Sequence, residues 1–188
     1  MLKRVEEHGM YAEITGLRNV KVESPEELLK TMRTDKQANV SVQFFNAQLI
    51  ATWEHLYFAV LNALTAFRTK RNVSKNLAVE VMLYASGQRQ IRKAIEFLGV
   101  RRGCSDVAVA IIGEDQDEVK AAVSAVSQHF CREPDEAVLE LSTVKAQEIR
   151  KAFMITENEL AVVTKNGDAE RAVVDLVIER MALLSTRL

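Results

Sequence analysis

Few side chains in this sequence have the type and spacing that catalysis requires. Of the three histidines, His55 directly follows Glu54 in an apolar stretch, and such a pair could act as a general base. A histidine on an apolar helix is more often held in the core by hydrogen bonds, and we expect that role for His55. His8 and His129 have no suitable partner nearby in the sequence. The histidines therefore predict no catalytic site.

Motifs of the common enzyme and metal-site classes are also missing. The chain has no Gly-x-Ser-x-Gly elbow, Gly-x-x-x-x-Gly-Lys phosphate loop, Gly-x-Gly-x-x-Gly turn or His-Glu-x-x-His helix. Cys104 and Cys131 form no Cys-x-x-Cys pair, and we expect two inert buried thiols. The acidic run 114–118 lacks the glycine of a calcium loop and suits a helix start. We predict no catalytic residue, no metal and no cofactor.

Positive charge is concentrated in one segment of an almost neutral chain. The 188 residues carry a net charge of −1, but residues 65–103 contain nine basic and two acidic residues, a local charge of +7. The other 149 residues contain 16 basic and 24 acidic ones. A cationic segment with few aromatic residues suits contact with nucleic-acid phosphates. The alternative, which we weigh equally, is that these charges form a solvated face without a ligand. The nine are Arg68, Lys70, Arg71, Lys75, Arg89, Arg92, Lys93, Arg101 and Arg102.

Hydrophobic periodicity predicts the elements that position these residues. Strands are expected over 10–14, 20–22, 40–44 and 106–113, with 138–141 as a further candidate. Helices are expected over 24–33, 47–67, 74–85, 91–98, 119–130, 143–153 and 169–186. Residues 74–85 also fit a strand, and Ser74 as a cap favours the helix. Asn46 is positioned to cap the long helix, and Gly99 is expected as a left-handed helix end.

Composition and length favour one ordinary globular domain over residues 1–188. The chain is 48% hydrophobic and 27% charged, with 7 Gly and 2 Pro, and we find no linker or repeat. We predict the α+β class, with a small mixed or antiparallel sheet covered by several helices. The apolar stretch 49–67 contains Glu54, His55 and Asn62, so it fits a buried helix and not a membrane span. Without a secretory leader, we expect a cytoplasmic protein.

The last predicted helix carries two apolar stripes. The first is broad and typical of a core face, and it comprises Val173, Val174, Val177, Ile178, Met181, Leu184 and Leu188. The second comprises Ala172, Leu176 and Leu183 and is separated from the first by charged residues. Either a partner protein or a neighbouring helix of the same domain covers this second stripe.

Several segments resemble a known family in order and spacing. They are Phe45–Leu49, Glu54–Ala63, Tyr84–Ile95, Phe97–Val100, Val107–Ile112 and Ile178–Leu183. Together they resemble the kinase-binding subunit of the KEOPS complex, and 86–91 is closer to its archaeal members than to the animal form. The resemblance implies a non-catalytic accessory subunit. KEOPS attaches threonylcarbamoyl to the adenosine next to the anticodon of tRNA.

The resemblance also implies two direct partners and one indirect one. The small atypical kinase, acting as an ATPase, would be bound directly and stimulated, and tRNA would be recruited, whereas the transferase subunit belongs to the same complex. Under this resemblance we assign the kinase contact to Leu176, Met181, Leu183 and Leu184. We assign tRNA phosphates to Arg68, Lys70, Arg71, Lys75, Arg89 and Arg92. The alternatives are a stand-alone RNA-binding module and a small enzyme in which His55 and Glu54 line a pocket.

Overall fold

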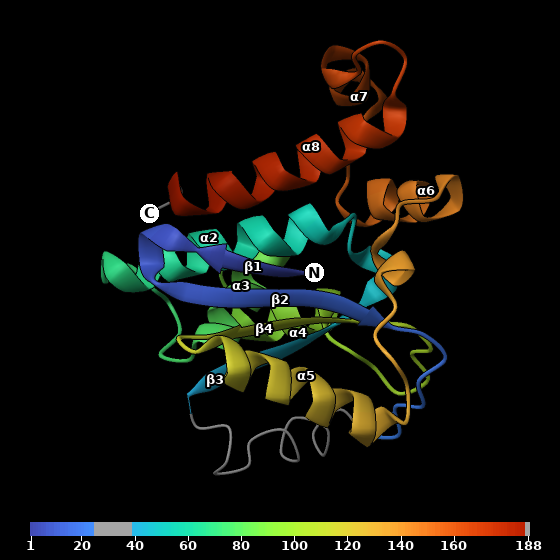
Figure 1. Ribbon diagram of the computed structural model, residues 1–188. Coiled ribbons are helices and arrows are strands. Elements are labelled where there is room, and N and C mark those ends of the chain that lie inside the picture. Colours follow the sequence, from blue (N-terminus) through green and yellow to red (C-terminus); the bar gives the residue numbers. More distant parts are fainter. Residues whose placement is uncertain (25–38, 187–188) are drawn as a thin grey trace.

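The computed structural model describes residues 1–24 and 39–186 (Figure 1). The helix expected over 24–33 therefore lies outside the described residues, apart from Ser24. Within the described ranges, no helix is both long and apolar enough to cross a membrane. The long apolar stretch that follows residue 49 instead belongs to a core helix, as expected.

Four strands of the described chain form one antiparallel sheet. They are β1 (Leu2–Val5), β2 (Met10–Leu17), β3 (Val40–Asn46) and β4 (Val107–Gly113). Their order is β1-β2-β4-β3, so the last strand in the chain lies between β2 and β3. Leu17 and Asn46 both lie opposite Val107, one on each side of β4. The α+β class is confirmed, with the antiparallel form of the sheet.

The sequence of β4 explains how it is covered on both faces. All seven of its residues are buried, and successive side chains of a strand point to opposite faces. Ala108, Ala110 and Ile112 belong to the core cluster shared with α2 and α3, whereas Val107, Val109 and Ile111 belong to the cluster shared with α5. The two alanines reduce the side-chain bulk on the face that several helices cover.

Helices form the remaining layers (Figure 1). They are α2 (Trp53–Arg68), α3 (Leu77–Ser86), α4 (Ile91–Leu98), α5 (Gln116–Phe130), α6 (Thr143–Ala152), α7 (Glu157–Val163) and α8 (Ala169–Ala182). Short 3-10 turns are η1 (Glu6–His8), η3 (Ala47–Leu49), η4 (Glu136–Leu139) and η5 (Leu183–Thr186). Helices α2 and α3 cover one face of the sheet and α5 covers the other, while α8 lies on α2 and α3 and also contacts α6 and α7.

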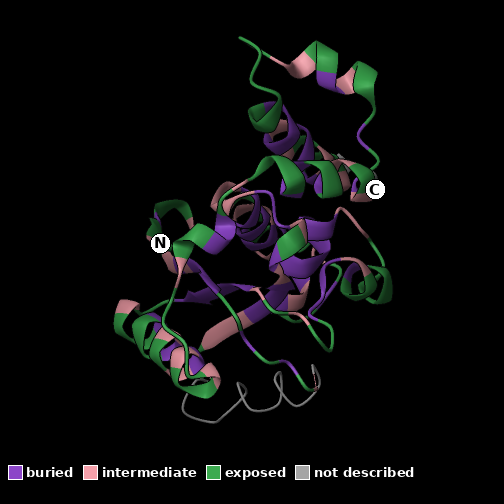
Figure 2. Cartoon of the chain, turned by 90° about the vertical axis from the view of Figure 1, so that its right-hand side faces the viewer, coloured by how far each residue is buried: buried purple, intermediate pink, exposed green. Residues whose placement is uncertain are grey.

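Figure 2 shows how these layers divide buried from exposed surface. Helices α2 and α3 are largely buried between the sheet and α8, whereas α5 exposes its outer side. Helix α7 has one buried residue, Leu160, and lies at the edge of the fold. Helices α2 and α3 therefore form the central buried layer of the molecule.

Several element boundaries differ from the expectations. Asn46 does cap a helical turn, but this turn is η3, and α2 begins only at Trp53. Residues 20–22 are not a strand, and 138–141 overlaps the 3-10 turn η4. Gly99 has a φ of −66° and is not left-handed. A Cβ there would collide with the Ile95 carbonyl oxygen, so close approach of the backbone is what requires glycine.

Candidate functional site

The end of α2 turns two of the predicted cations outward. The Thr69 hydroxyl donates a hydrogen bond to the Thr65 carbonyl at 2.8 Å. Lys70 adopts a left-handed φ of 57°, and the N–H of Arg71 donates to the Ala66 carbonyl at 2.9 Å. A left-handed residue of this kind ends many helices. Lys70 and Arg71 are consequently exposed directly after the helix.

Helix α3 and the turn after it carry a third cation. The helix begins at Leu77, where the Asn76 side chain, and not Ser74 as expected, accepts the N–H of Val79. It ends at Gly87, whose φ of 60° is left-handed. The N–H of Gln88 then donates to the Leu83 carbonyl at 3.1 Å. The turn leaves Arg89 beside the last turns of α3.

Arg71 and Arg89 line the same hollow, which has a volume of about 240 Å³. We call it the α2–α3 hollow. Its other lining residues include Asn62 of α2, Glu80 and Tyr84 of α3, and Leu184 of η5. The structure thus joins the loop after α2 to the turn before α4, which is the convergence that a phosphate-binding patch requires.

The six cations assigned to tRNA differ in the partners of their side chains. All six residues are exposed. Arg92 forms an ion pair with Glu96 at 2.8 Å, and Arg68 donates to the Glu7 carbonyl at 3.3 Å. In residues 1–24 and 39–186, no carboxylate lies within 4.0 Å of the side-chain nitrogens of the other four, which are Lys70, Arg71, Lys75 and Arg89. Of the six assigned cations, these four have no carboxylate partner in the described part of the fold.

In the described part of the chain, neither carboxylate of the cationic segment forms an ion pair with Arg71 or Arg89. Glu96 is engaged by Arg92, and Glu80 is 1% exposed and turned toward backbone N–H groups. Burial, together with the Glu80 charge, raises the pKa of the Tyr84 hydroxyl, and Arg89 opposes this shift. Tyr84 is therefore a neutral hydrogen-bond donor at neutral pH. The hollow is lined by the two arginines, by the hydroxyl-bearing residues Thr65, Thr69 and Tyr84, and by an apolar wall.

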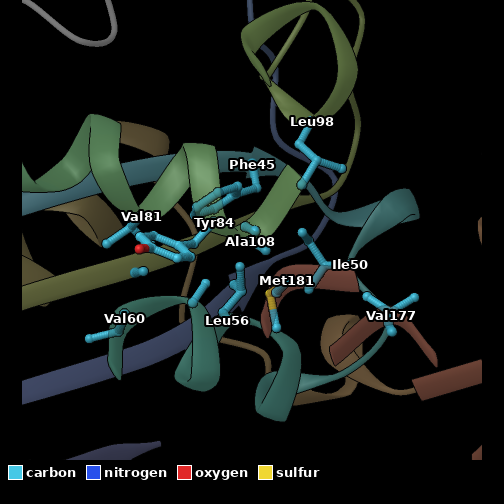
Figure 3. Packing of buried hydrophobic residues seen from close by; sticks show 14 of the residues in the cluster. Phe45, Ile50, Leu56, Val60, Val81, Tyr84, Leu98, Ala108, Val177 and Met181 are labelled. Atoms are coloured by element: carbon cyan, nitrogen blue, oxygen red, sulfur yellow. The ribbon is translucent and has the colours of Figure 1, made fainter. Parts of the chain in front are cut away.

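Helix α8 does not present the side chains that the kinase assignment requires. Leu176 is 3% exposed and Met181 is 0% exposed. Met181 lies in the same cluster as Leu56 and Ile50 (Figure 3). Both apolar stripes of α8 are largely covered, because the helix packs between α2 and α3 on one side and α6 and α7 on the other. Ala172 and Leu176 of the second stripe are therefore covered by neighbouring helices of the same chain and not by a partner protein.

The last turn, η5, begins with side chains that are more exposed than the assigned residues of α8. Leu183 is 39% exposed, and Leu184 is partly buried against the core while also lining the α2–α3 hollow. Of the four residues assigned to a protein partner, only these two have accessible side chains in this conformation. Removing all residues from 172 onward would also delete core side chains such as Val173 and Val177, so substitutions at η5 are the cleaner test.

His55 is a structural residue, as expected. It is completely buried on α2, and its Nδ1 accepts the N–H of Ala51 at 3.2 Å. Nε2 therefore carries the proton and donates it to the Ala85 carbonyl at 2.8 Å. Burial lowers the pKa of His55 to about 4, so the ring is neutral near pH 7. The neighbouring Glu54 pairs with Arg171 instead, and the two residues form no base–carboxylate pair.

The other candidate groups have ordinary surroundings. The described part of the chain holds no cluster of three or more His, Cys, Asp or Glu side chains suited to a metal ion. The expectation of two buried thiols is wrong, because Cys131 is exposed and Cys104 only partly buried. The acidic run does start a helix: the Asp115 side chain accepts the N–H groups of Asp117 and Glu118.

Sequence reasoning missed the polar residues that complete the hollow. Tyr84, Gln88 and Asn62 line it, although none belongs to the charge pattern from which the site was predicted. Gly87 was the available signal. A glycine in the left-handed conformation folds the chain back, so the residues on either side of it lie close together.

Comparison with known proteins places this fold in a family. Residues 18–185 match the family described as Kinase binding protein CGI-121. The chain is 31% identical over 145 residues to the Regulatory protein Cgi121 of Methanocaldococcus jannaschii, covering 77% of this chain and 83% of the relative. It is 35% identical over 60 residues to the KEOPS complex subunit Cgi121 of Pyrococcus abyssi, covering 31% and 35%. The expected resemblance is confirmed: the chain belongs to the CGI-121 family of kinase binding proteins.

Proposed function

We propose that this protein is a non-catalytic accessory subunit of a KEOPS complex. In this role it binds and stimulates the small atypical kinase, which acts as an ATPase, and it helps recruit tRNA for threonylcarbamoylation of the adenosine next to the anticodon. The family and the name of the Pyrococcus abyssi relative support the complex. The observation that carries the proposal is the convergence of Arg71 and Arg89, both unpaired within the described residues, on one hollow.

The electrostatics of the α2–α3 hollow favour RNA as its ligand. Pairing with a carboxylate would reduce the attraction of an arginine for phosphate, and Arg71 and Arg89 have no such pair within the described chain. Lys70 and Lys75 extend the same positive charge along the loop between α2 and α3. Phosphate contacts fix the position of an RNA without reading its sequence. This suits a subunit that serves many tRNAs with different sequences.

The C-terminal turn is the best candidate for the kinase contact. Leu183 is exposed, and its neighbour Leu184 is partly buried and lines the hollow. In this proposal Leu183 and Leu184 touch the kinase, while Leu176 and Met181 support the turn from within the core. The kinase would then adjoin the RNA site, since Leu184 belongs to the wall that also contains Arg71 and Arg89.

Binding to tRNA tests the first half of the proposal. Replacing Arg71, Lys75 and Arg89 with glutamine removes three unpaired charges from the surface. The affinity for a tRNA transcript should fall, and the slope of log K against log salt should decrease by about 2–3, because each lost phosphate contact changes it by about 0.7–0.9. An unchanged salt slope would contradict the assignment of these cations.

Co-purification with the kinase tests the second half. Leu183→Glu combined with Leu184→Glu places two charges on the proposed contact, and Val162→Glu is the control because Val162 is 85% exposed on α7. We expect the double variant to lose the kinase and its stimulation of tRNA modification, while the control keeps both. If the wild type binds tRNA but does not capture the kinase, the protein is a stand-alone RNA-binding module. The burial of α8 within the fold favours this alternative.

A further inference from the structure

A buried carboxylate lies directly beneath the cationic loop. Glu80 belongs to α3 and is 1% exposed. Its Oε2 accepts the N–H of Ser74 at 2.7 Å and the N–H of Val73 at 3.1 Å, and its Oε1 lies 3.2 Å from the same Val73 nitrogen. A buried charge is tolerated only when hydrogen bonds of this kind satisfy it. Glu80 therefore binds the backbone of the loop instead of another side chain.

The loop around this carboxylate is closed by further hydrogen bonds. The Asn72 side-chain amide donates to the Ser74 carbonyl at 2.9 Å, and the N–H of Asn76 donates to the Ser74 hydroxyl at 3.1 Å. Ser74 itself is 7% exposed, although it lies in the middle of a surface loop. The backbone between Arg71 and Lys75 is thus held from both sides.

The carboxylate oxygens of Glu80 bind backbone N–H groups and not the nearby arginines. Glu80 lines the α2–α3 hollow together with Arg71 and Arg89. Within residues 1–24 and 39–186, it forms no ion pair with either of them. A carboxylate whose acceptor oxygens bind N–H groups fixes the loop without capturing the cations that the loop presents. Charge-assisted hydrogen bonds are about twice as strong as neutral ones, which suits this task.

We propose that Glu80 is a positioning residue that holds Arg71 and Lys75 in the geometry needed to bind RNA phosphates. The inference rests on the proposed RNA binding. A loop that is ordered before binding loses little further entropy when RNA arrives, so its cations contribute more to affinity. The negative charge of Glu80 thereby strengthens binding to a polyanion, which is opposite in sign to the effect of an average surface carboxylate.

A matched pair of variants tests this sign. Glu80→Gln and Glu96→Gln each raise the net charge by one, and both residues belong to the cationic segment. The amide that replaces the Glu80 carboxylate would have to turn its NH₂ group toward an N–H donor. Glu80→Gln should therefore loosen the loop and weaken tRNA binding by about threefold to tenfold, with a smaller salt slope. Glu96→Gln frees Arg92 from its ion pair and should bind tRNA as tightly as the wild type or more tightly.

Hydrogen exchange of the free protein gives an independent readout. The Val73 and Ser74 amides should exchange slowly in the wild type and much faster in Glu80→Gln, while amides of β4 keep their protection. Asn72→Ala is a second variant that loosens the same loop without touching a buried charge, so a poorly folded Glu80→Gln would not end the test. Its tRNA affinity should also fall, by a smaller factor.

The outcomes separate the two proposals. A wild type that does not bind tRNA overturns the proposed function. Wild-type binding combined with equal or tighter binding by both Glu80→Gln and Asn72→Ala overturns the role of Glu80 alone. Retained protection of the Val73 and Ser74 amides in folded Glu80→Gln overturns it as well. Weakened binding by Glu80→Gln, with unweakened binding by Glu96→Gln, supports it.

Discussion

The two ends of helix α2 treat their charged and polar side chains in opposite ways. At the first turn, Glu54 pairs with Arg171, and both ring nitrogens of His55 bind backbone groups. Just after the last turn, Lys70 and Arg71 are exposed, and the described residues provide no carboxylate partner for either of them. At the first turn of α2, the charged and polar side chains therefore have partners within the fold, and we call this the structural end. After the last turn, the cations have no carboxylate partner among the described residues, and we call this the unsatisfied end.

This difference separates residues that hold the fold from residues that are free to bind. Leaving a buried polar group without a partner costs about 1–3 kcal/mol, so the first end of α2 must satisfy its hydrogen bonds for the chain to fold. An exposed arginine remains hydrated by water and carries no such penalty. Its lack of a partner is compatible with stability and useful for a ligand. Each end should therefore respond to substitution in a different measurement.

The largest effect is expected at the structural end. His55→Ala removes a buried ring and leaves the Ala51 N–H and the Ala85 carbonyl without partners. We expect the free energy of unfolding to fall by about 4 kcal/mol, measured by urea denaturation. His129→Ala is the control, because His129 is exposed and its loss should change stability by about 0.5 kcal/mol or less. Equal effects of the two substitutions would contradict the structural role of His55.

The next effect is the pH dependence that His55 confers. Its pKa in the folded state is about 4, below the ordinary value of 6.5. Between these values the unfolded chain binds a proton that the folded chain excludes, so the free energy of unfolding falls as pH decreases through this window. The loss is about 3 kcal/mol when complete, and stability is insensitive to this group above pH 6.5.

The difference between wild type and His55→Ala isolates this contribution from the carboxylates. The destabilisation caused by the substitution should shrink by about 3 kcal/mol as the pH is lowered from 7 to 4, because only the folded wild type must exclude the proton from the ring. Denaturation midpoints measured at intervals across this range provide the test. A destabilisation that is independent of pH would show that the ring takes up its proton as readily in the folded chain as in the unfolded chain.

The unsatisfied end should respond in RNA binding and not in stability. Arg71→Gln removes one exposed charge from the α2–α3 hollow. The salt slope of tRNA binding should fall by about 0.7–0.9, which corresponds to about a sixfold loss of affinity at 0.1 M salt, or about 1 kcal/mol. The free energy of unfolding should change by about 0.5 kcal/mol or less. If Arg71→Gln lowers the free energy of unfolding and leaves RNA binding unchanged, Arg71 is a structural residue and not an RNA contact.

The layers of the fold could be predicted from the sequence because hydrophobic periodicity reflects burial. Alternation in 10–14 and the continuous apolar run 106–113 correctly indicated β2 and β4. Helix α7 was missed although Thr156 and Glu159 form a capping box at its start, because its apolar run 160–163 is continuous and shows no helical period. The 138–141 segment is apolar because η4 packs against β2, and neither burial nor composition distinguishes such a turn from a short strand.

The site was only partly predictable. Exposed cations can be counted in a sequence, and the i,i+4 spacing of Arg92 and Glu96 on a predicted helix indicates their ion pair, but whether Arg71 meets a carboxylate depends on the fold. The stripes of α8 failed as a guide to a partner surface for a related reason. An apolar stripe indicates that its residues are covered, but it does not show whether the same chain or a partner covers them. Here other helices of the same chain cover α8, and Leu176 is buried among them.

The smallest expected effect belongs to the ion pair at the structural end. Arg171 lies 2.5 Å from Glu54 and 2.9 Å from Asp175, but its side chain is 51% exposed. Exposed pairs contribute about 0–1 kcal/mol, so Arg171→Gln should lower the free energy of unfolding by less than about 1 kcal/mol. It removes the same charge as Arg71→Gln, and it should leave the salt slope of tRNA binding unchanged. If both substitutions reduce the slope equally, net charge and not the unpaired state of Arg71 determines RNA binding, and the distinction between the two ends of α2 fails.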